Sequence, residues 1–303
     1  MIQLLSVTKK FGEQTALDHV SLSVFDHQIC GLLGTNGAGK STAMRLICGI
    51  DTWDSGKIVV DGEEVYDNVN AKKKMFFCSD SPFYFPHSNS LEMAGYLEQF
   101  YEGFRMDLFL KWMDVFQLDV KRKIGTYSKG KKKQLSLLLG LASQTKYLLC
   151  DETFDGLDPA MRQAIKTLII GEMAERDLTV IISSHNLREL EDFCDSVILM
   201  HQGDVLLAKS LDEAKANCFR VQCVLKKEED MEVLKSRLSV QNLKRHDTMY
   251  TFTAECTKEQ MNQAMEGIET AYFELKSLSL EELFIMETEV AGYDIKNILL
   301  EAM

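Results

Sequence analysis

The sequence feature that most constrains this chain is the loop GTNGAGKS at residues 34–41. It fills every fixed position of the phosphate-binding pattern G-x-x-x-x-G-K-[ST], between an apolar run at 29–33 and a helix-like stretch that begins near Lys40. Glycines allow successive backbone N–H groups to turn inward around a phosphate, and the positive end of the following helix attracts the same anion. A plain glycine-rich turn is the alternative, which the complete match disfavours. The loop therefore predicts a bound nucleoside triphosphate.

The pattern assigns separate tasks within this loop. Lys40 is expected to reach the β- and γ-phosphates, and the hydroxyl of Ser41 is expected to hold Mg²⁺. The other contacts with the nucleotide are expected from Gly34, Asn36, Gly37, Ala38, Gly39 and Thr42.

Length and composition bound the protein class. A chain of 303 residues usually forms one large domain or two smaller ones. Its net charge of −12 disfavours non-specific binding to nucleic acid. We find no apolar run long enough to span a membrane and no signal segment, so we expect a cytosolic chain. The cysteines show no C-x-x-C spacing, which favours small buried thiols over a zinc site or a redox pair.

Two other apolar strands end in residues that suit phosphate chemistry. The run at 147–150 leads into Asp151 and Glu152, and the run at 179–182 leads toward His185. Ligands gather at the carboxyl ends of parallel strands, so Asp151 is placed to bind Mg²⁺ and Glu152 to activate a water molecule. His185 is placed to reach the γ-phosphate. A surface acidic pair and a structural histidine are the alternatives, which the nearby phosphate loop disfavours.

Two further features, a lysine run and an aromatic residue, each allow two interpretations. Three successive lysines, 131–133, lie where an apolar helix begins, and cations at that end oppose the helix dipole. This indicates either a functional site with a compensating anion or a solvated basic cluster. Phe11 lies at a turn, where it is either a packing residue or a stacking surface for an adenine ring.

Together these features resemble the nucleotide-binding subunit of an ATP-binding cassette (ABC) transporter. The motifs that carry the resemblance are 34–41 for Walker A, 148–152 for Walker B, Ser128-Lys129-Gly130 for the signature, Gly156-Leu157-Asp158 for the D-loop, His185 for the switch histidine, and Phe11 for the adenine-stacking aromatic. The match covers roughly residues 1–210.

The resemblance implies a fold, cofactors and partners. It implies an α/β P-loop NTPase cassette with a mixed sheet and a helical subdomain, which binds ATP and Mg²⁺. Two cassettes, identical or different, would pair head to tail, so that Ser128, Gly130 and Asp158 of one face the ATP of the other. A separate transmembrane permease subunit would hold this chain on the inner face of the cell membrane. No nucleic acid is expected as a partner.

Two positions depart from the pattern of the family. The signature keeps only Ser128 and Gly130 of its usual residues. The resemblance implies that these two make the γ-phosphate contacts. Asp80 stands where the family has a glutamine that touches Mg²⁺ and senses the membrane subunit. A carboxylate still binds Mg²⁺ or a water molecule, so we keep Asp80 as a candidate metal ligand and expect hydrolysis to be slower or coupled differently.

The stretch from 83 to 104 is rich in aromatic residues. Core packing is the default explanation for such a composition, and an exposed docking patch has the same one. The family receives the coupling helix of its membrane subunit at this place, which favours docking for part of the stretch. The helical spacing from Asn89 to about Leu118 predicts helix throughout.

The remainder of the chain contains no enzyme motif. We divide the chain into an ATPase domain at 1–212 and an accessory or dimerisation domain at 213–303. The second reads as strand, helix, strand, strand, helix, strand, which is the ferredoxin-like order, followed by a terminal helix at 279–287. The stretch 278–284 resembles the ending of ABC-2 exporter subunits. Spacing predicts a further amphipathic helix at 295–303.

The preferred function is therefore an ATPase that drives export through a separate membrane subunit. A soluble cassette protein acting on ribosomes or nucleic acid is the rival, but such proteins usually carry two cassettes or a long coiled-coil insertion. A small-molecule P-loop kinase explains neither Ser128-Lys129-Gly130 nor His185.

Overall fold

The computed structural model describes residues 1–290, so the predicted helix at 295–303 lies outside the described residues. The chain divides into two compact units, Met1–Ala208 and Lys209–Met303, a few residues before the predicted boundary. Within the described part, no helix is long and apolar enough to cross a membrane. The cysteines are free thiols, and all except Cys48 are buried.

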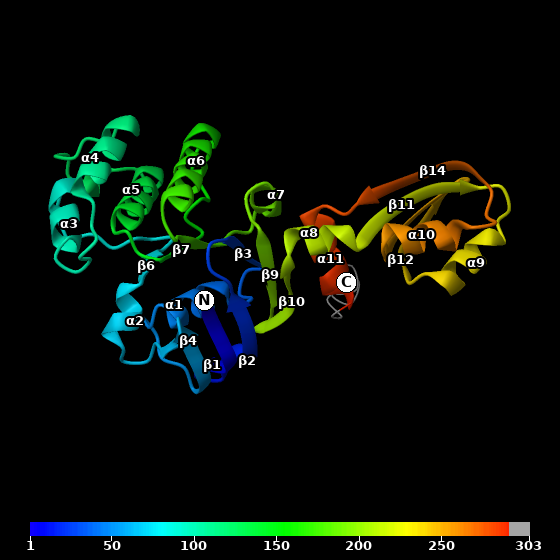
Figure 1. Cartoon of the computed structure of the whole chain (residues 1–303), viewed down its shortest axis with the longest axis horizontal. Coiled ribbons are helices and arrows are strands. Elements are labelled where there is room, and N and C mark those ends of the chain that lie inside the picture. Colours follow the sequence, from blue (N-terminus) through cyan, green and yellow to red (C-terminus); the bar gives the residue numbers. More distant parts are fainter. Residues whose placement is uncertain (291–303) are drawn as a thin grey trace, which may run out of the picture. The chain divides into compact units, whose positions relative to one another are not determined.

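The first unit contains a sheet with the strand order β10-β9-β3-β8-β7-β6 (Figure 1). Its strands are β3 (Ile29–Gly34), β6 (Met75–Cys78), β7 (Tyr147–Asp151), β8 (Thr179–Ser183), β9 (Ser196–His201) and β10 (Asp204–Ser210). From β9 to β6, neighbouring strands are parallel. Every residue of β3, β7 and β8 is buried, as their continuous apolar runs predict for parallel strands. The parallel order brings the carboxyl ends of β3, β7 and β8 to one edge.

A second sheet in this unit has the order β2-β1-β4-β5. Its strands are β1 (Ile2–Phe11), β2 (Gln14–Val24), β4 (Ser55–Val60) and β5 (Glu63–Glu64), and each neighbouring pair is antiparallel. Helix α1 (Lys40–Ile47) shares one hydrophobic core with both sheets, which includes Leu4, Leu32 and Met44. That packing holds the start of α1 against the end of β3.

The remaining helices of the first unit are α2 (Val69–Lys73), α3 (Ser90–Leu97), α4 (Met106–Val115), the short 3₁₀ helix Ile124–Thr126, α5 (Lys129–Ala142), α6 (Pro159–Glu175) and α7 (Leu187–Glu191). Figure 1 shows α3, α4 and α5 grouped as a helical lobe. The prediction of helix from 89 to 118 is wrong between α3 and α4. The chain turns there, and the N–H of Arg105 donates to the carbonyl of Ala142 in α5 instead of continuing the helix.

The second unit contains a four-stranded sheet with the order β12-β13-β11-β14, in which all neighbouring strands are antiparallel. Its elements are α8 (Leu211–Ala216), β11 (Cys218–Leu225), α9 (Asp230–Arg237), β12 (Val240–His246), β13 (Met249–Glu255), α10 (Lys258–Met265), β14 (Thr270–Ser277) and α11 (Leu280–Val290). This unit has its own hydrophobic core, which joins the sheet to α9 and α10. The core includes Phe219, Leu234, Phe252 and Met261. Helix α8 was not predicted.

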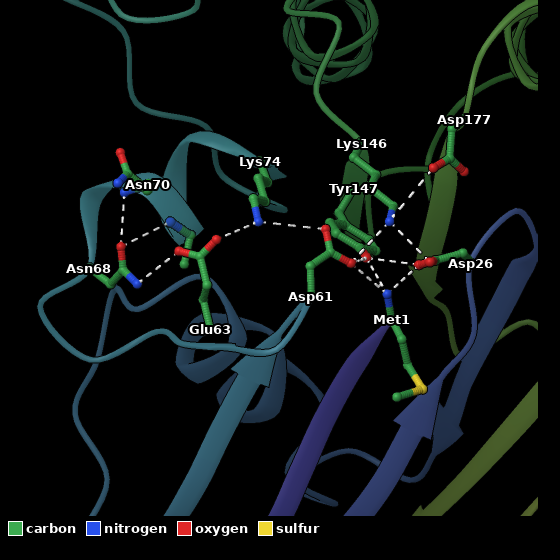
Figure 2. A network of polar contacts seen from close by, with 11 residues as sticks. Met1, Asp26, Asp61, Glu63, Asn68, Asn70, Lys74, Lys146, Tyr147 and Asp177 are labelled. Carbon is green, nitrogen blue, oxygen red and sulfur yellow. Dashed lines mark hydrogen bonds and ion pairs between the residues drawn. The ribbon is translucent and has the colours of Figure 1, made fainter.

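A network of charges surrounds the amino end of β7 (Figure 2). The hydroxyl oxygen of the buried Tyr147 lies within hydrogen-bond distance of two carboxylates, 2.6 Å from Asp61 and 2.8 Å from Asp26, and its one proton can be donated to either. The ammonium of Lys146 lies 3.0 Å from each of these carboxylates, and the amine of Met1 contacts both of them as well. Burial alone would raise the pKa of Asp61, but the hydrogen bonds from these donors outweigh it and hold that pKa well below its ordinary value. The network ties β7 to the segments that follow β2 and β4.

We predict that Asp61→Asn lowers the free energy of unfolding at pH 7 by about 2 kcal/mol, because it removes the acceptor of several charge-assisted hydrogen bonds. The pKa of Asp61 is depressed in the folded state, so its contribution is present above the ordinary carboxyl pKa of 3.8 and is lost as the pH falls below that value. Urea unfolding at a series of pH values measures both effects. Asp177→Asn is the matched control, because that exposed carboxylate lies 3.6 Å from Lys146. Equal losses in the two variants would contradict the assignment.

Candidate active site

The phosphate loop connects β3 to α1 and depends on two crowded glycines. Gly39 caps α1 with a φ of 102°, and a Cβ at this position would lie 2.6 Å from the carbonyl oxygen of Ala16. A Cβ at Gly34 would lie 2.3 Å from the carbonyl oxygen of Met200. Both positions therefore need glycine for space as well as for conformation. Among the residues that the structure describes, no side chain caps the N-terminus of α1, which follows the loop directly, and a helix N-terminus with free N–H groups is a site that binds phosphate.

Lys40 is buried against this loop. Its ammonium donates to the carbonyl oxygens of Gly34 at 2.8 Å and Thr35 at 3.1 Å. Burial lowers the pKa of Lys40, and the nearby charges of Glu152, Asp151 and Asp155 counteract that effect. The ammonium is thus held inside the loop, where a phosphate would compete with the two carbonyl groups for its protons.

Ser41, Asp151 and Ser183 meet at the carboxyl edge of the sheet. The hydroxyl groups of Ser41 and Ser183 both donate to the Oδ1 atom of Asp151, at 3.0 and 2.7 Å. Asp151 and Ser183 are register partners at the ends of β7 and β8. A carboxylate beside a hydroxyl group is the kind of hard oxygen set that Mg²⁺ prefers, so these residues fit the predicted metal. Ser183 is not among the predicted site residues, although the sequence places it at the end of a buried apolar run.

Glu152 follows Asp151 in an uncommon backbone conformation, with a φ of 47°. The left-handed region costs a residue with a side chain roughly 1–2 kcal/mol, so neighbouring groups must hold it there. The N–H of Glu152 donates to the hydroxyl of Ser183 at 2.9 Å, and its carbonyl accepts from Lys133 Nζ at 2.7 Å. The predicted catalytic carboxylate therefore stands on a segment clamped from both sides.

His185 pairs with Asp155, which lies in the segment after Glu152. Its Nδ1 atom is 3.1 Å from Oδ2 of Asp155, whose other oxygen accepts from the hydroxyl of Ser184 at 2.9 Å. One ligand-type atom each of Glu152, Asp155 and His185 lies within 4.8 Å of the others. The imidazole is exposed, so its second nitrogen remains accessible to a ligand. Asp155 was not among the predicted site residues.

The predicted signature and D-loop residues lie at helix starts. Ser128 caps α5 by accepting from the N–H of Lys131 at 3.3 Å, and Asp158 caps α6 by accepting from that of Met161 at 3.0 Å. Gly130 lies close to the D-loop, since a Cβ there would be 3.5 Å from the carbonyl oxygen of Gly156. The two motifs are therefore neighbours within one unit.

The lysines of α5 do not behave alike. Lys131 is exposed, whereas Lys133 is buried and lies 2.6 Å from the carboxylate of Asp80. That ion pair lowers the pKa of Asp80. Asp80 thus contacts the signature helix, whereas Ser41 and Asp151 contact each other. The role of Asp80 as a metal ligand stays a prediction.

Phe11 ends β1 with about half of its surface exposed. The ammonium of Lys9 lies 4.8 Å from the centroid of its ring. Phe11 is therefore not a core residue, and its open face is available for stacking.

Comparison with known proteins decides among the classes that this geometry allows. The family model described as ABC transporter matches residues 17–155. The methionine import ATP-binding protein MetN of Haemophilus influenzae is 30% identical over 232 residues, which cover 72% of this chain and 67% of that protein. This chain belongs to the ABC transporter family.

Other relatives extend the match of this ABC protein beyond the cassette. The ABC transporter ATP-binding protein YtrB of Bacillus subtilis is 28% identical over 286 residues, covering 94% of this chain and 97% of that protein. A solved ATP-binding subunit of an ABC transporter has a TM-score of 0.66 at 22% identity and covers 71% of this chain and 92% of its own. These matches confirm the P-loop cassette fold and the family predicted from the motifs. The protein is an ABC transporter ATPase.

We predict that Gly39→Ala abolishes ATP binding by this ATPase, because the new Cβ would collide with Ala16 and Leu17 and would distort the phosphate loop. Overpacking of this kind costs about 1–3 kcal/mol of stability in addition. Titration calorimetry with MgATP and urea unfolding measure the two effects. Gly62→Ala is the control, since Gly62 also has a positive φ, 81°, but a Cβ there meets nothing within 4 Å. Intact ATP binding by Gly39→Ala would refute the crowding argument.

Proposed function

We propose that this ABC ATPase binds MgATP between two cassettes that pair head to tail, and that hydrolysis drives export through a separate membrane-spanning subunit. The observation that carries the proposal is the convergence of Lys40, Ser41, Asp151 and Glu152 at one edge of the sheet. In this scheme Ser128, Gly130 and Asp158 of the second cassette complete the ATP-binding site. Phe11 stacks on the adenine ring.

The residues have separate roles in the proposed reaction. Lys40 exchanges its loop carbonyls for phosphate oxygens, which relieves the cost of holding a buried ammonium without a counter-charge in contact. Ser41 and Asp151 would hold Mg²⁺, which when bound neutralises charge on the phosphates. Glu152 accepts a proton from the attacking water, and His185 donates a hydrogen bond to the γ-phosphate while Asp155 fixes its ring.

The direction of transport rests on relatives and on the end of the chain. BcrA of Bacillus licheniformis, a bacitracin transport ATP-binding protein, is 29% identical over 219 residues, which cover 71% of this chain and 71% of that protein. MetN is by its name an import protein, so the cassette alone does not set direction. The ABC-2-like stretch 278–284 favours export. We place the protein on the inner face of the cell membrane, bound to its permease.

An exposed aromatic patch supports docking to such a permease. The patch comprises Phe83, Phe85, Tyr96 and Phe100, whose rings form a continuous row with successive centroids 5.8, 4.9 and 4.9 Å apart. Phe83 is 76% and Phe100 51% exposed, so the row is not core packing. Exposed aromatic rows of this kind are typical of protein interfaces.

We predict that Glu152→Gln abolishes ATP turnover while it leaves ATP-dependent dimerisation intact, because the amide keeps the shape of the side chain but accepts no proton. Light scattering with MgATP and a phosphate-release assay measure the two properties beside the wild-type chain. Normal turnover by the variant would exclude Glu152 as the base. Loss of dimerisation in both proteins would mean that this cassette needs a different partner.

We also predict that Phe83→Ser combined with Phe100→Ser releases the protein from the membrane fraction of its cells. These changes remove exposed rings of the aromatic patch and touch no nucleotide contact, so ATP binding by the purified chain should stay within about twofold of the wild type. Phe25→Ser removes an equally exposed ring outside the patch and serves as the control. Unchanged membrane association of the double variant would contradict docking at this patch.

A further inference from the structure

Lys133 joins three segments of the active site through one buried ammonium group. Its Nζ atom lies 2.6 Å from Oδ1 of Asp80, 2.7 Å from the carbonyl oxygen of Glu152 and 2.9 Å from that of Asp155. Only 10% of its side chain is exposed. An ammonium has three protons to donate, and here each one faces an acceptor from the protein.

The two carbonyl groups that Lys133 holds belong to the segment that must be positioned for catalysis. Glu152 has the left-handed backbone conformation, and its carbonyl accepts from Lys133 at 2.7 Å, shorter than the 3.3 Å bond that it accepts from the N–H of Asp155. The carboxylate of Asp155 in turn lies 3.1 Å from the ring of His185. Removing the ammonium would leave two carbonyl groups and one carboxylate without this donor, and the strained segment would be free to relax.

We propose that Lys133 is a positioning residue for ATP hydrolysis: its ammonium holds the backbone of Glu152 and Asp155 in the reactive arrangement, and Asp80 is its counter-ion and not a ligand of Mg²⁺. The inference rests on the proposed role of Glu152. It also explains the basic start of α5. The buried lysine of that run, Lys133, has its compensating anion, Asp80, within the same chain.

The same contacts connect the aromatic patch to the site. Asp80 lies in the loop that carries Phe83 and Phe85, and Tyr84 of this loop donates to the carbonyl oxygen of Lys132 at 2.7 Å. The loop is thus attached to the first turns of α5 at two points.

The first experiment compares Lys133→Met with the wild-type full-length chain. The methionine keeps the apolar stem and loses the donor. We expect kcat for ATP hydrolysis to fall by about tenfold or more, since small displacements of reacting groups cost up to ~100-fold, while KM for ATP stays within about threefold. Hydrogen exchange without nucleotide should become faster in the peptide that covers residues 150–158.

Two further variants control this comparison. Lys73→Met removes an exposed ion pair with Glu102, 3.0 Å long, in the same unit, and should change neither kcat nor exchange. Lys133→Gln keeps an N–H donor without the charge and should restore part of the lost rate. It also replaces Lys133→Met as the test variant if the latter does not fold. If the Lys133 variants match Lys73→Met in both kcat and exchange, the proposal is overturned.

A double-mutant cycle with Asp80→Asn distinguishes the counter-ion from a metal ligand. If Asp80 acts through Lys133, its replacement lowers kcat in the wild-type background and has almost no effect in the Lys133→Met background. The Mg²⁺ concentration for half-maximal rate then stays unchanged. A rise of that concentration about tenfold or more, present in both backgrounds, would show that Asp80 binds the metal and would overturn this part of the proposal.

The exchange measurement separates this inference from the proposed function. It reports whether Lys133 holds the segment 150–158 and needs no hydrolysis, whereas Glu152→Gln reports whether Glu152 is the base. Faster exchange in Lys133→Met together with normal turnover in Glu152→Gln would leave the clamp standing and reject the assigned base. Unchanged exchange with an inactive Glu152→Gln would reject the clamp and keep the function.

Discussion

The burial of ionisable groups at the carboxyl edge of the main sheet is the constraint on which the active site depends. Lys40, Asp151 and Lys133 are all buried, so water has little access to their charges. Each must find its partners in the protein: Lys40 in two loop carbonyls, Asp151 in two hydroxyl groups, Lys133 in two carbonyls and a carboxylate. Because each charge is surrounded in this way, the positions of the groups that would handle phosphate are determined before any nucleotide binds.

Much of this arrangement could be predicted from the sequence, because it depends on local signals. The glycine positions of the phosphate loop predict its conformation, and short apolar runs predict the buried parallel strands. Asp151, Glu152 and His185 each follow such a run, so their gathering at one edge requires only that the strands be parallel. The helical pattern did not predict the break between α3 and α4, because the apolar spacing continues across it. The backbone N–H of Arg105 donates to Ala142 of α5 there instead of continuing the helix.

The parts that could not be predicted depend on contacts between distant segments. Asp80 and Lys133 are far apart in the sequence, and no local pattern around either residue predicts that they form an ion pair. Helical spacing does not separate the lysines either: Lys131 precedes Leu135 and Leu139 at the same spacing at which Lys133 precedes Leu137 and Leu141, and all residues of α5 from Lys133 to Ala142 are buried. Of the two interpretations left open for the run, a solvated residue describes the exposed Lys131, and a lysine with a compensating anion describes the buried Lys133.

The two ends of β7 divide the work between stability and catalysis. At its amino end, Tyr147 is fixed by a network in which every carboxylate has several donors. At its carboxyl end, Asp151 leads into Glu152, whose backbone conformation is unfavourable in itself. A segment with such strain persists only where the surrounding structure determines its position more strongly than the strain opposes it. Since β7 is short and buried throughout, a firmly held amino end limits how far the strand can shift. The left-handed turn at Glu152 is then held by Ser183, by Lys133 and by the N–H of Asp155.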